Sequence, residues 1–300
     1  RMTIPERSWA EPPRTGAYRC RFNPFAATLR WTEWGPLDGD PVICVHGLTR
    51  TGRDFDVLAR LLAGQGRRVI CPDIFGRGIS DWLVEGALYS VPTYVTGLAP
   101  MLASLERPYD WVGTSMGGLI GMSVAALPGN RLRRLVLNDV GAFIPAEALS
   151  HIGAYMAEAL SFPDLPALER HLRAIHAGFG RLTDAQWRHL AETSARATVD
   201  GRLVLHYDPA IGEPMRLSPA ADVDLWALWR MLDLPVLLLR GEDSPLLLPE
   251  TAARMLERPG TELAVIPGCG HAPALMSLSQ TSLVARFLAR ERDAHAEVTP

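Results

Sequence analysis

The sequence predicts an α/β protein with a doubly wound, mostly parallel sheet and a mostly helical cap inserted into it. Short, continuous apolar runs alternate with longer segments of helical spacing, a pattern typical of parallel strands that are buried on both faces. One stretch, residues 143–231, breaks this alternation with several helical patterns in succession. We therefore assign residues 1–142 and 232–300 to the α/β core and residues 143–231 to the cap.

The first part of the core supplies most of the expected strands. An alternating, Trp- and Thr-containing segment predicts a half-exposed strand, and the later apolar runs predict fully buried ones. The expected strands are Thr28–Gly35, Pro41–Val45, Arg68–Cys71, Trp111–Val112 and Leu135–Leu137. The expected helices between them are Asp54–Leu62, Thr93–Leu105 and Leu119–Ala126.

The remaining expected elements belong to the cap and to the part of the core that follows the cap in the sequence. The expected cap helices are Pro145–Leu160, Leu165–His176 and Thr183–Ala195, with a short strand within Gly201–Tyr207. The core then resumes with the strands Pro235–Leu239 and Glu262–Ile266 and the final helix Leu275–Ala289. Inserted segments on a rigid scaffold often carry function, so we expect the cap to take part in substrate selection.

Composition excludes several classes of function. The 300 residues carry a net charge of −3, which argues against a polybasic face for nucleic acid or membrane. No apolar run reaches the ~18 residues of a transmembrane helix, and the polar, proline-containing start lacks the apolar region of a secretory signal. All thirty cations are arginine, so lysine chemistry is excluded. Four cysteines without a C-x-x-C pair indicate reduced thiols and a cytoplasmic location.

A nucleophile motif lies between an expected strand and an expected helix. Residues 113–117 read G-T-S-M-G and match G-x-S-x-G in the strand–turn–helix context that this motif requires. Gly113 and Gly117 permit a turn so tight that the hydroxyl of Ser115 is pushed clear of the sheet edge. The following helix points its N-terminus, with free N–H groups, at the reacting carbonyl. Ser115 is therefore the candidate nucleophile.

A nucleophilic serine needs a base, and His271 is the best placed of eight histidines. It follows the last expected strand, at the sheet edge where active sites of open parallel sheets gather. His46 ends an early strand and is more typical of a structural turn. The others fall in the cap or the polar tail: His151, His171, His176, His189, His206 and His295. For the oxyanion hole we expect the backbone N–H groups of Met116 and Leu48.

Six motifs in this order resemble those of the α/β-hydrolases across nearly the whole chain. They are V-H-G-L-T-R (45–50), C-P-D-I-F-G-R-G-I-S (71–80), V-G-T-S-M-G-G (112–118), L-V-L-N-D-V-G (135–141), L-L-R-G-E-D-S (238–244) and P-G-C-G-H-A-P (267–273). The resemblance implies a sheet of about eight strands, a serine triad, no metal and no organic cofactor.

The triad acid has two candidates. Most members of the family place the acid after the strand 235–239, three residues beyond a glycine, but here that position is Ser244 and the neighbouring acid is Asp243. Asp139 ends the strand that follows the nucleophile helix, and the pattern Gly-x-x-Ser-Pro resembles small esterases that take their acid from that strand. We therefore prefer Asp139 and retain Asp243 as the alternative.

The expected reaction is hydrolysis of a small to medium, largely uncharged carboxylic ester through an acyl-enzyme on Ser115. C–C bond hydrolases, enol-lactonases and acyltransferases use the same triad and remain alternatives, and a non-catalytic ligand-binding hydrolase fold is a more distant one. Arg50 follows the oxyanion turn and could meet a substrate carboxylate, but a solvated surface position is favoured. The expected partner is a small-molecule ester, and the chain is expected to be a monomer or a homodimer.

Overall fold

The structure is a computed structural model that describes residues 12–156, 160–214 and 220–290. Eight strands form one sheet, as the family resemblance implied. In spatial order they are β1 (Arg14–Phe22), β2 (Phe25–Trp34), β4 (Arg68–Asp73), β3 (Pro41–Val45), β5 (Tyr109–Thr114), β6 (Leu132–Asn138), β12 (Val236–Gly241) and β13 (Thr261–Ile266). The six strands from β4 to β13 are parallel, whereas β2 pairs antiparallel with both β1 and β4. The predicted doubly wound, mostly parallel sheet is therefore confirmed.

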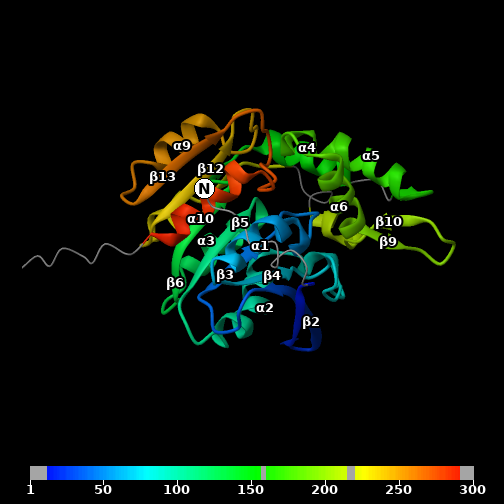
Figure 1. The fold of residues 1–300 in the computed structure, drawn as a ribbon, viewed down its shortest axis with the longest axis horizontal. Helices are drawn as coiled ribbons and strands as arrows, with labels where there is room; N and C mark the ends of the chain where they lie inside the picture. Colours follow the sequence, from blue (N-terminus) through cyan, green and yellow to red (C-terminus); the bar gives the residue numbers. More distant parts are fainter. Residues whose placement is uncertain (1–11, 157–159, 215–219, 291–300) are drawn as a thin grey trace, which may run out of the picture.

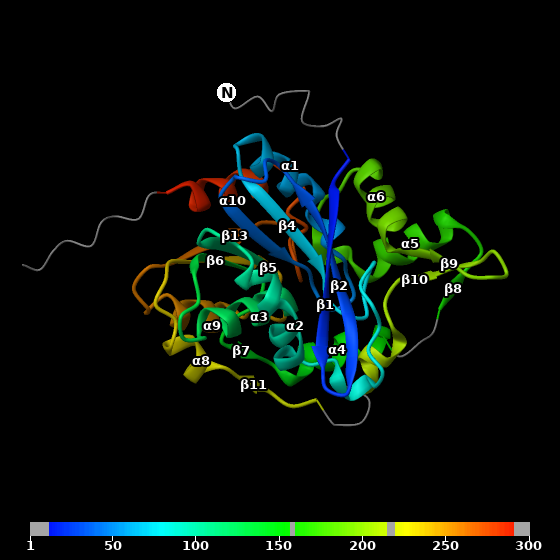
Figure 2. The ribbon, with the colours of Figure 1, turned by 90° about the horizontal axis from the view of Figure 1, so that it is seen from below.

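The parallel strands are buried on both faces because neighbouring residues of each strand enter different cores. In β3, Ile43 and Val45 join one apolar cluster, while Val42 and Cys44 join the other. Helices α1 (Asp56–Gly64) and α10 (Leu278–Ala289) cover the second cluster. The first lies under α2 (Val91–Ala103), α3 (Met116–Ala125), α8 (Trp226–Arg230) and α9 (Pro249–Met255). Figure 2 shows these four helices on the opposite side of the sheet from α1 and α10. The continuous apolar runs in the sequence reflect this two-sided burial.

Residues 143–231, the expected cap, contain helices and very short strands. The helices are α4 (Ala146–Met156), α5 (Leu165–Ile175), α6 (Asp184–Ser194) and α8. The strands are β7 (Phe143–Ile144), β8 (Ser161–Phe162), β9 (Ala195–Ala197), β10 (Leu203–Leu205) and β11 (Val223–Asp224). Helices α5 and α6 pack on each other around a third apolar cluster, and Figure 1 shows them beside the sheet rather than on one of its faces. The described part of this segment is thus largely helical, but a three-stranded sheet of β8, β10 and β9 was not expected.

None of the described helices is long and apolar enough to cross a membrane. All four cysteines are buried free thiols, in agreement with the reduced thiols expected for a chain without a C-x-x-C pair.

Candidate active site

The turn between β5 and α3 holds Ser115 in a strained backbone conformation. Ser115 has φ 51° and ψ −116°, a region that residues with a side chain rarely occupy. The turn leaves no room for larger neighbours: a Cβ on Gly113 would lie 2.3 Å from the Gly117 carbonyl oxygen, and one on Gly117 would lie 1.9 Å from that of Val45. The two glycines therefore permit the close approach of α3 to β3 and β5 that lifts Ser115 to the sheet edge.

Ser115, His271 and Asp139 lie in one hydrogen-bonded row. His271 Nε2 is 3.0 Å from Ser115 Oγ, and His271 Nδ1 is 2.7 Å from Asp139 Oδ2. The three side chains come from three loops at the carboxyl ends of β5, β6 and β13, which meet at one edge of the sheet. A neutral His271 with its proton on Nδ1 would donate to Asp139 and accept from the serine hydroxyl, the arrangement that a general base requires.

The Asp139 carboxylate is fully buried and accepts two more hydrogen bonds. The Gly241 N–H donates to Oδ1 at 2.9 Å, and the Ser244 hydroxyl donates to Oδ2 at 2.6 Å. Ser244, which stands where the family resemblance implies the acid, thus contacts Asp139, the preferred candidate acid. Donors of this kind stabilise an ionised carboxylate and fix its orientation.

Asp243, the alternative acid, is not brought to His271. It is exposed, and no hydrogen bond or ion pair of its carboxylate is recorded among the described residues. Only its backbone N–H is held, by the Cys269 carbonyl at 2.9 Å. Asp243 does line the cavity next to Ser115, so it contributes charge to the cavity rim.

The two expected oxyanion donors flank Ser115. Met116 is the first residue of α3, where an N–H has no partner within the helix. Leu48 belongs to the turn after β3, which the Arg50 N–H closes on the Gly47 carbonyl at 3.2 Å. No hydrogen bond from either the Leu48 or the Met116 N–H to another described residue is recorded. Both groups are therefore available for a ligand oxygen.

His46 fixes the turn that carries Leu48. The ring Nε2 accepts from the Ile74 N–H at 3.0 Å, so the proton is on Nδ1, which donates to the Gly47 carbonyl at 2.7 Å. Burial lowers the pKa of His46 well below its usual value, and the ring stays neutral. This geometry fits a structural turn residue.

Asn138 is a residue of the site that the sequence analysis missed. Its side-chain amide donates to the Thr114 hydroxyl at 3.0 Å and to the Pro273 carbonyl at 2.8 Å. It thereby ties the loop that carries His271 to the strands that carry Ser115 and Asp139. The only signal in the sequence was a polar residue at the end of an apolar run, which predicts a strand end and nothing more.

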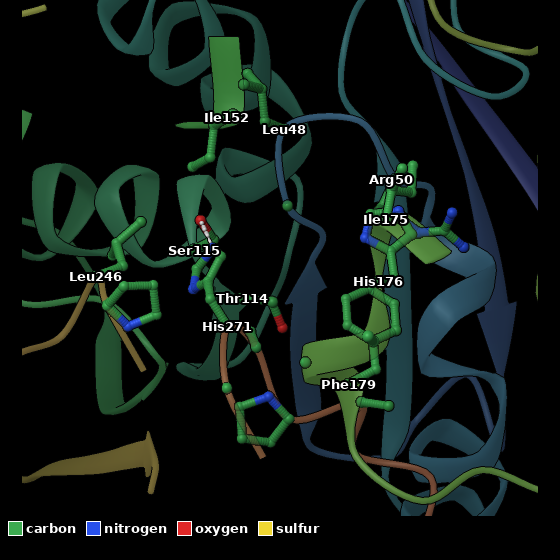
Figure 3. A pocket seen from close by; sticks show the side chains of 18 of the residues that line it. Leu48, Arg50, Thr114, Ser115, Ile152, Ile175, His176, Phe179, Leu246 and His271 are labelled. Carbon is green, nitrogen blue, oxygen red and sulfur yellow. Dashed lines mark hydrogen bonds between the residues drawn. The ribbon is translucent and has the colours of Figure 1, made fainter. Parts of the chain in front are cut away.

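Two cavities meet at Ser115. The first, of about 690 Å³, is bordered by His271 and by residues of α4 and α5, and the second, of about 590 Å³, is lined mainly by apolar residues of α2, α3 and α4. The residues common to both are Leu48, Ser115, Ile152 and Leu246. Figure 3 shows Ser115 and His271 together on one side of the view and Arg50, His176 and Phe179 on the other. A bound molecule could therefore extend from Ser115 in two directions.

Arg50 is buried rather than on the solvated surface, which corrects the favoured expectation for this residue. Its Nε and Nη2 donate to the carboxylate of Asp54 at 2.8 and 2.7 Å, and its guanidinium lies 5.9 Å from the ring centre of Phe179. His176 stacks on the same ring at 4.4 Å, and burial lowers the pKa of His176 well below its usual value. Arg50 and His176 both line the larger cavity.

Within the described ranges, no group of three or more His, Cys, Asp or Glu side chains is arranged to hold a metal ion.

Buried neutral histidines predict a loss of stability in acid. Burial lowers the pKa of His206 to about 3, and its Nδ1 accepts from the Gly78 N–H at 2.7 Å. In the unfolded chain this histidine has a pKa of about 6.5 and binds a proton as the pH falls below that value, whereas the buried ring in the folded protein does not. Unfolding therefore becomes more favourable as the pH falls. We expect His206 to account for roughly 2 kcal/mol of lost unfolding free energy between pH 7 and pH 5.

Urea unfolding at both pH values measures this effect, with His206→Asn as the comparison because an amide oxygen can still accept from Gly78. The decrease between pH 7 and pH 5 should be smaller in the variant than in the parent. Asp73, whose pKa burial raises to about 6, acts in the opposite direction but equally in both proteins. Equal decreases in the two proteins would contradict the prediction.

Comparison with known proteins shows the family and the fold of the chain. A family model described as "Alpha/beta hydrolase family" matches residues 42–286. A 3-hydroxybutyrate-oligomer hydrolase of Cupriavidus necator is 40% identical over 286 residues, which are 92% of this chain and 97% of that protein. A solved α/β hydrolase from Novosphingobium aromaticivorans is 34% identical, with a TM-score of 0.82 over 92% of this chain and 98% of that one. The structure of E-2-(acetamidomethylene)succinate hydrolase is 25% identical, with a TM-score of 0.77 over 92% and 100% of the two chains.

Proposed function

Because the chain belongs to the α/β-hydrolase family, we propose that it hydrolyses carboxylic esters through an acyl-enzyme on Ser115. The observation that carries this proposal is the hydrogen-bonded row of Ser115, His271 and Asp139, which opens where two cavities meet. A strained serine, an imidazole and a buried carboxylate in this order are the parts of a nucleophilic hydrolase.

In the proposed mechanism, His271 Nε2 takes the proton of Ser115 as its oxygen attacks the ester carbonyl. The carbonyl oxygen becomes negative and accepts hydrogen bonds from the N–H groups of Leu48 and Met116. The C–O bond then breaks, and the alcohol leaves with the proton from His271. A water molecule, deprotonated by the same histidine, attacks the acyl-enzyme and releases the acid together with free Ser115.

For the substrate we propose short linear oligoesters of hydroxy acids. The relative with 40% identity is named for 3-hydroxybutyrate oligomers and is matched over nearly its full length. Two cavities joined at Ser115 suit a chain that continues on both sides of the cleaved bond. An oligomer of this type ends in a carboxylate, and Arg50 in the larger cavity is the cation that could receive it.

We further propose that residues 143–231 act as a cap that shapes both cavities. Helix α4 contributes Ile152 to the walls of both cavities, and α5 contributes Ile175 to the wall of the larger one. His176, which follows α5, and Phe179, which stacks on it, extend the wall of the larger cavity. A cap in this place limits the access of bulk water to the acyl-enzyme and sets the size of the groups on either side of the ester.

The experiment that tests this function is hydrolysis of the 3-hydroxybutyrate dimer, its methyl ester and p-nitrophenyl butyrate by the purified protein. We expect turnover of all three, with a KM for the free-acid dimer about tenfold below that of its methyl ester, because only the free acid can pair with Arg50. Arg50→Met should remove this difference and leave the KM for p-nitrophenyl butyrate unchanged.

Testing 2-(acetamidomethylene)succinate as a further substrate distinguishes ester hydrolysis from the hydrolysis for which the structural relative is named. Turnover of that compound without turnover of any ester would overturn the ester assignment. Equal KM values for the two dimers would instead contradict only the assignment of Arg50.

A further inference from the structure

Arg77 is a buried cation that has no acidic partner in the described part of the chain. It lies in the loop after β4 and is fully buried, yet no carboxylate of the described residues lies within ion-pair distance of its guanidinium. Its Nε donates to the Leu48 carbonyl at 2.8 Å, and its Nη1 donates to the Phe75 carbonyl at 2.7 Å and to the Tyr94 hydroxyl at 2.8 Å. Buried charges are normally paired, so an unpaired one calls for a reason.

The surroundings of Arg77 stabilise its charge without cancelling it. The guanidinium carbon lies 5.6 Å from the ring centre of Tyr89 and 5.1 Å from that of Tyr94. Such contacts are attractive because the face of an aromatic ring is negative, but they supply no formal negative charge. The buried carboxylate of Asp208 accepts from the Tyr89 hydroxyl at 2.6 Å and is thus linked to Arg77 through that ring, not by a direct ion pair. The positive charge of Arg77 therefore lies in a region of low dielectric constant without a direct counter-ion among the described residues.

The nearest parts of the candidate site are the two residues that carry the oxyanion donors. Arg77 holds the carbonyl of Leu48, and its Nη2 lies 3.6 Å from the sulfur of Met116. Holding the Leu48 carbonyl fixes the peptide group that follows Leu48. The peptide group that carries the Leu48 N–H is fixed on its other side, where His46 Nδ1 and the Arg50 N–H contact the Gly47 carbonyl, so the turn is held on both sides of Leu48. One side chain thus contacts both sides of the expected oxyanion hole.

We propose that Arg77 is a positioning residue of the oxyanion hole, which orients Leu48 and Met116 and whose unpaired charge favours the negative tetrahedral oxygen. The inference rests on the proposed function, because it assigns a role to the same site. Arg77 does not touch the substrate: it lines neither of the two cavities at Ser115 and acts from behind Leu48, Met116 and Tyr94. Since the oxyanion charge develops only in the transition state, Arg77 should affect kcat and not substrate binding.

The test compares Arg77→Gln, which keeps a hydrogen-bond donor but removes the charge, with Arg77→Lys, which keeps the charge. With p-nitrophenyl butyrate we expect the Gln variant to lose about 30-fold in kcat at nearly constant KM, less than the 10²- to 10³-fold cost of removing a direct oxyanion donor. The Lys variant should lose less than about fivefold, because a cation remains in the region of low dielectric constant.

Inhibitor binding supplies a readout that a merely structural role would not produce. Phenylboronic acid forms an anionic tetrahedral adduct on an active serine, whereas butyrate resembles the ground-state product. In the Gln variant we expect the affinity for phenylboronic acid to fall by about the same factor as kcat, with the affinity for butyrate unchanged. Arg134→Met removes another buried arginine at the opposite end of β6, next to Asp110, and should change the melting temperature without changing kcat.

A folded Gln variant with kcat within threefold of the parent would overturn the proposal, as would equal losses in the Gln and Lys variants. If the Gln variant does not fold, the Lys variant is measured in its place. Equal losses of affinity for phenylboronic acid and for butyrate in the Lys variant would then overturn the proposal. If the parent hydrolyses no ester, the proposed function fails, but Ser115 labelling by a fluorophosphonate passes through a similar oxyanion. A labelling rate that falls in the Gln variant and not in the Lys variant would then still support the role of Arg77.

Discussion

Replacement of Ser115 by alanine is expected to lower kcat by about 10⁵- to 10⁶-fold, to the level that binding and the oxyanion donors alone provide. The reason is that the acyl-enzyme cannot form without the serine oxygen, and His271 then has only water to activate. Labelling by a fluorophosphonate should be lost completely. The melting temperature should change little, because the hydroxyl has one recorded partner in the described structure, His271, at 3.0 Å.

A useful control for this variant is Ser123→Ala, because Ser123 is a serine of the same helix α3 whose hydroxyl donates only to the Leu119 carbonyl. It should keep full activity and full labelling. Substantial ester turnover by a pure Ser115→Ala protein would show that another group attacks the substrate, and the assignment of the nucleophile would have to be abandoned.

The core strands could be predicted because each buried strand is a run of consecutive apolar residues. Pro41–Val45 is entirely buried and was predicted with its exact bounds, since five apolar residues in a row have few alternatives. Strand β1 was missed because only Cys20 of its nine residues is buried, and its pairing with β2 depends on backbone hydrogen bonds that any sequence can make. Helix α9 has seven residues, too few for a helical period to emerge.

For the candidate site, local motifs predicted individual residues but not their connections. The turn around Ser115 is encoded by the two glycines beside it, and His271 follows a recognisable strand end. Arg77 and Asn138 act through contacts with residues far away in the sequence, such as Leu48 at 29 positions and Pro273 at 135. Such contacts depend on which strands become neighbours, and a single sequence does not reveal this directly.

The choice of the acid shows the same limit, because Ser244 occupies the position that the family resemblance assigns to the acid, and the preferred candidate, Asp139, lies 105 residues earlier. Asp139→Asn is expected to lower kcat by about 10⁴-fold at nearly constant KM. An asparagine fits the same space but can present an N–H₂ group to His271 Nδ1, which favours the wrong tautomer and cannot stabilise the imidazolium that forms during the reaction. Measured kcat and KM for p-nitrophenyl butyrate test this directly.

Asp243→Asn is the matched comparison, because it makes the same chemical change at an exposed residue on the cavity rim, and we expect it to keep nearly full activity. Ser244→Ala supplies an intermediate case. Besides His271, two donors hold the Asp139 carboxylate: the Ser244 hydroxyl and the Gly241 N–H. The variant removes the hydroxyl but leaves the Gly241 N–H and the contact with His271 in place. Its loss in kcat should therefore be about ten- to a hundredfold, the cost of one hydrogen bond to a charged group. If Asp243→Asn lost activity while Asp139→Asn kept it, the loop after β12 would have to rearrange on substrate binding to bring Asp243 to His271.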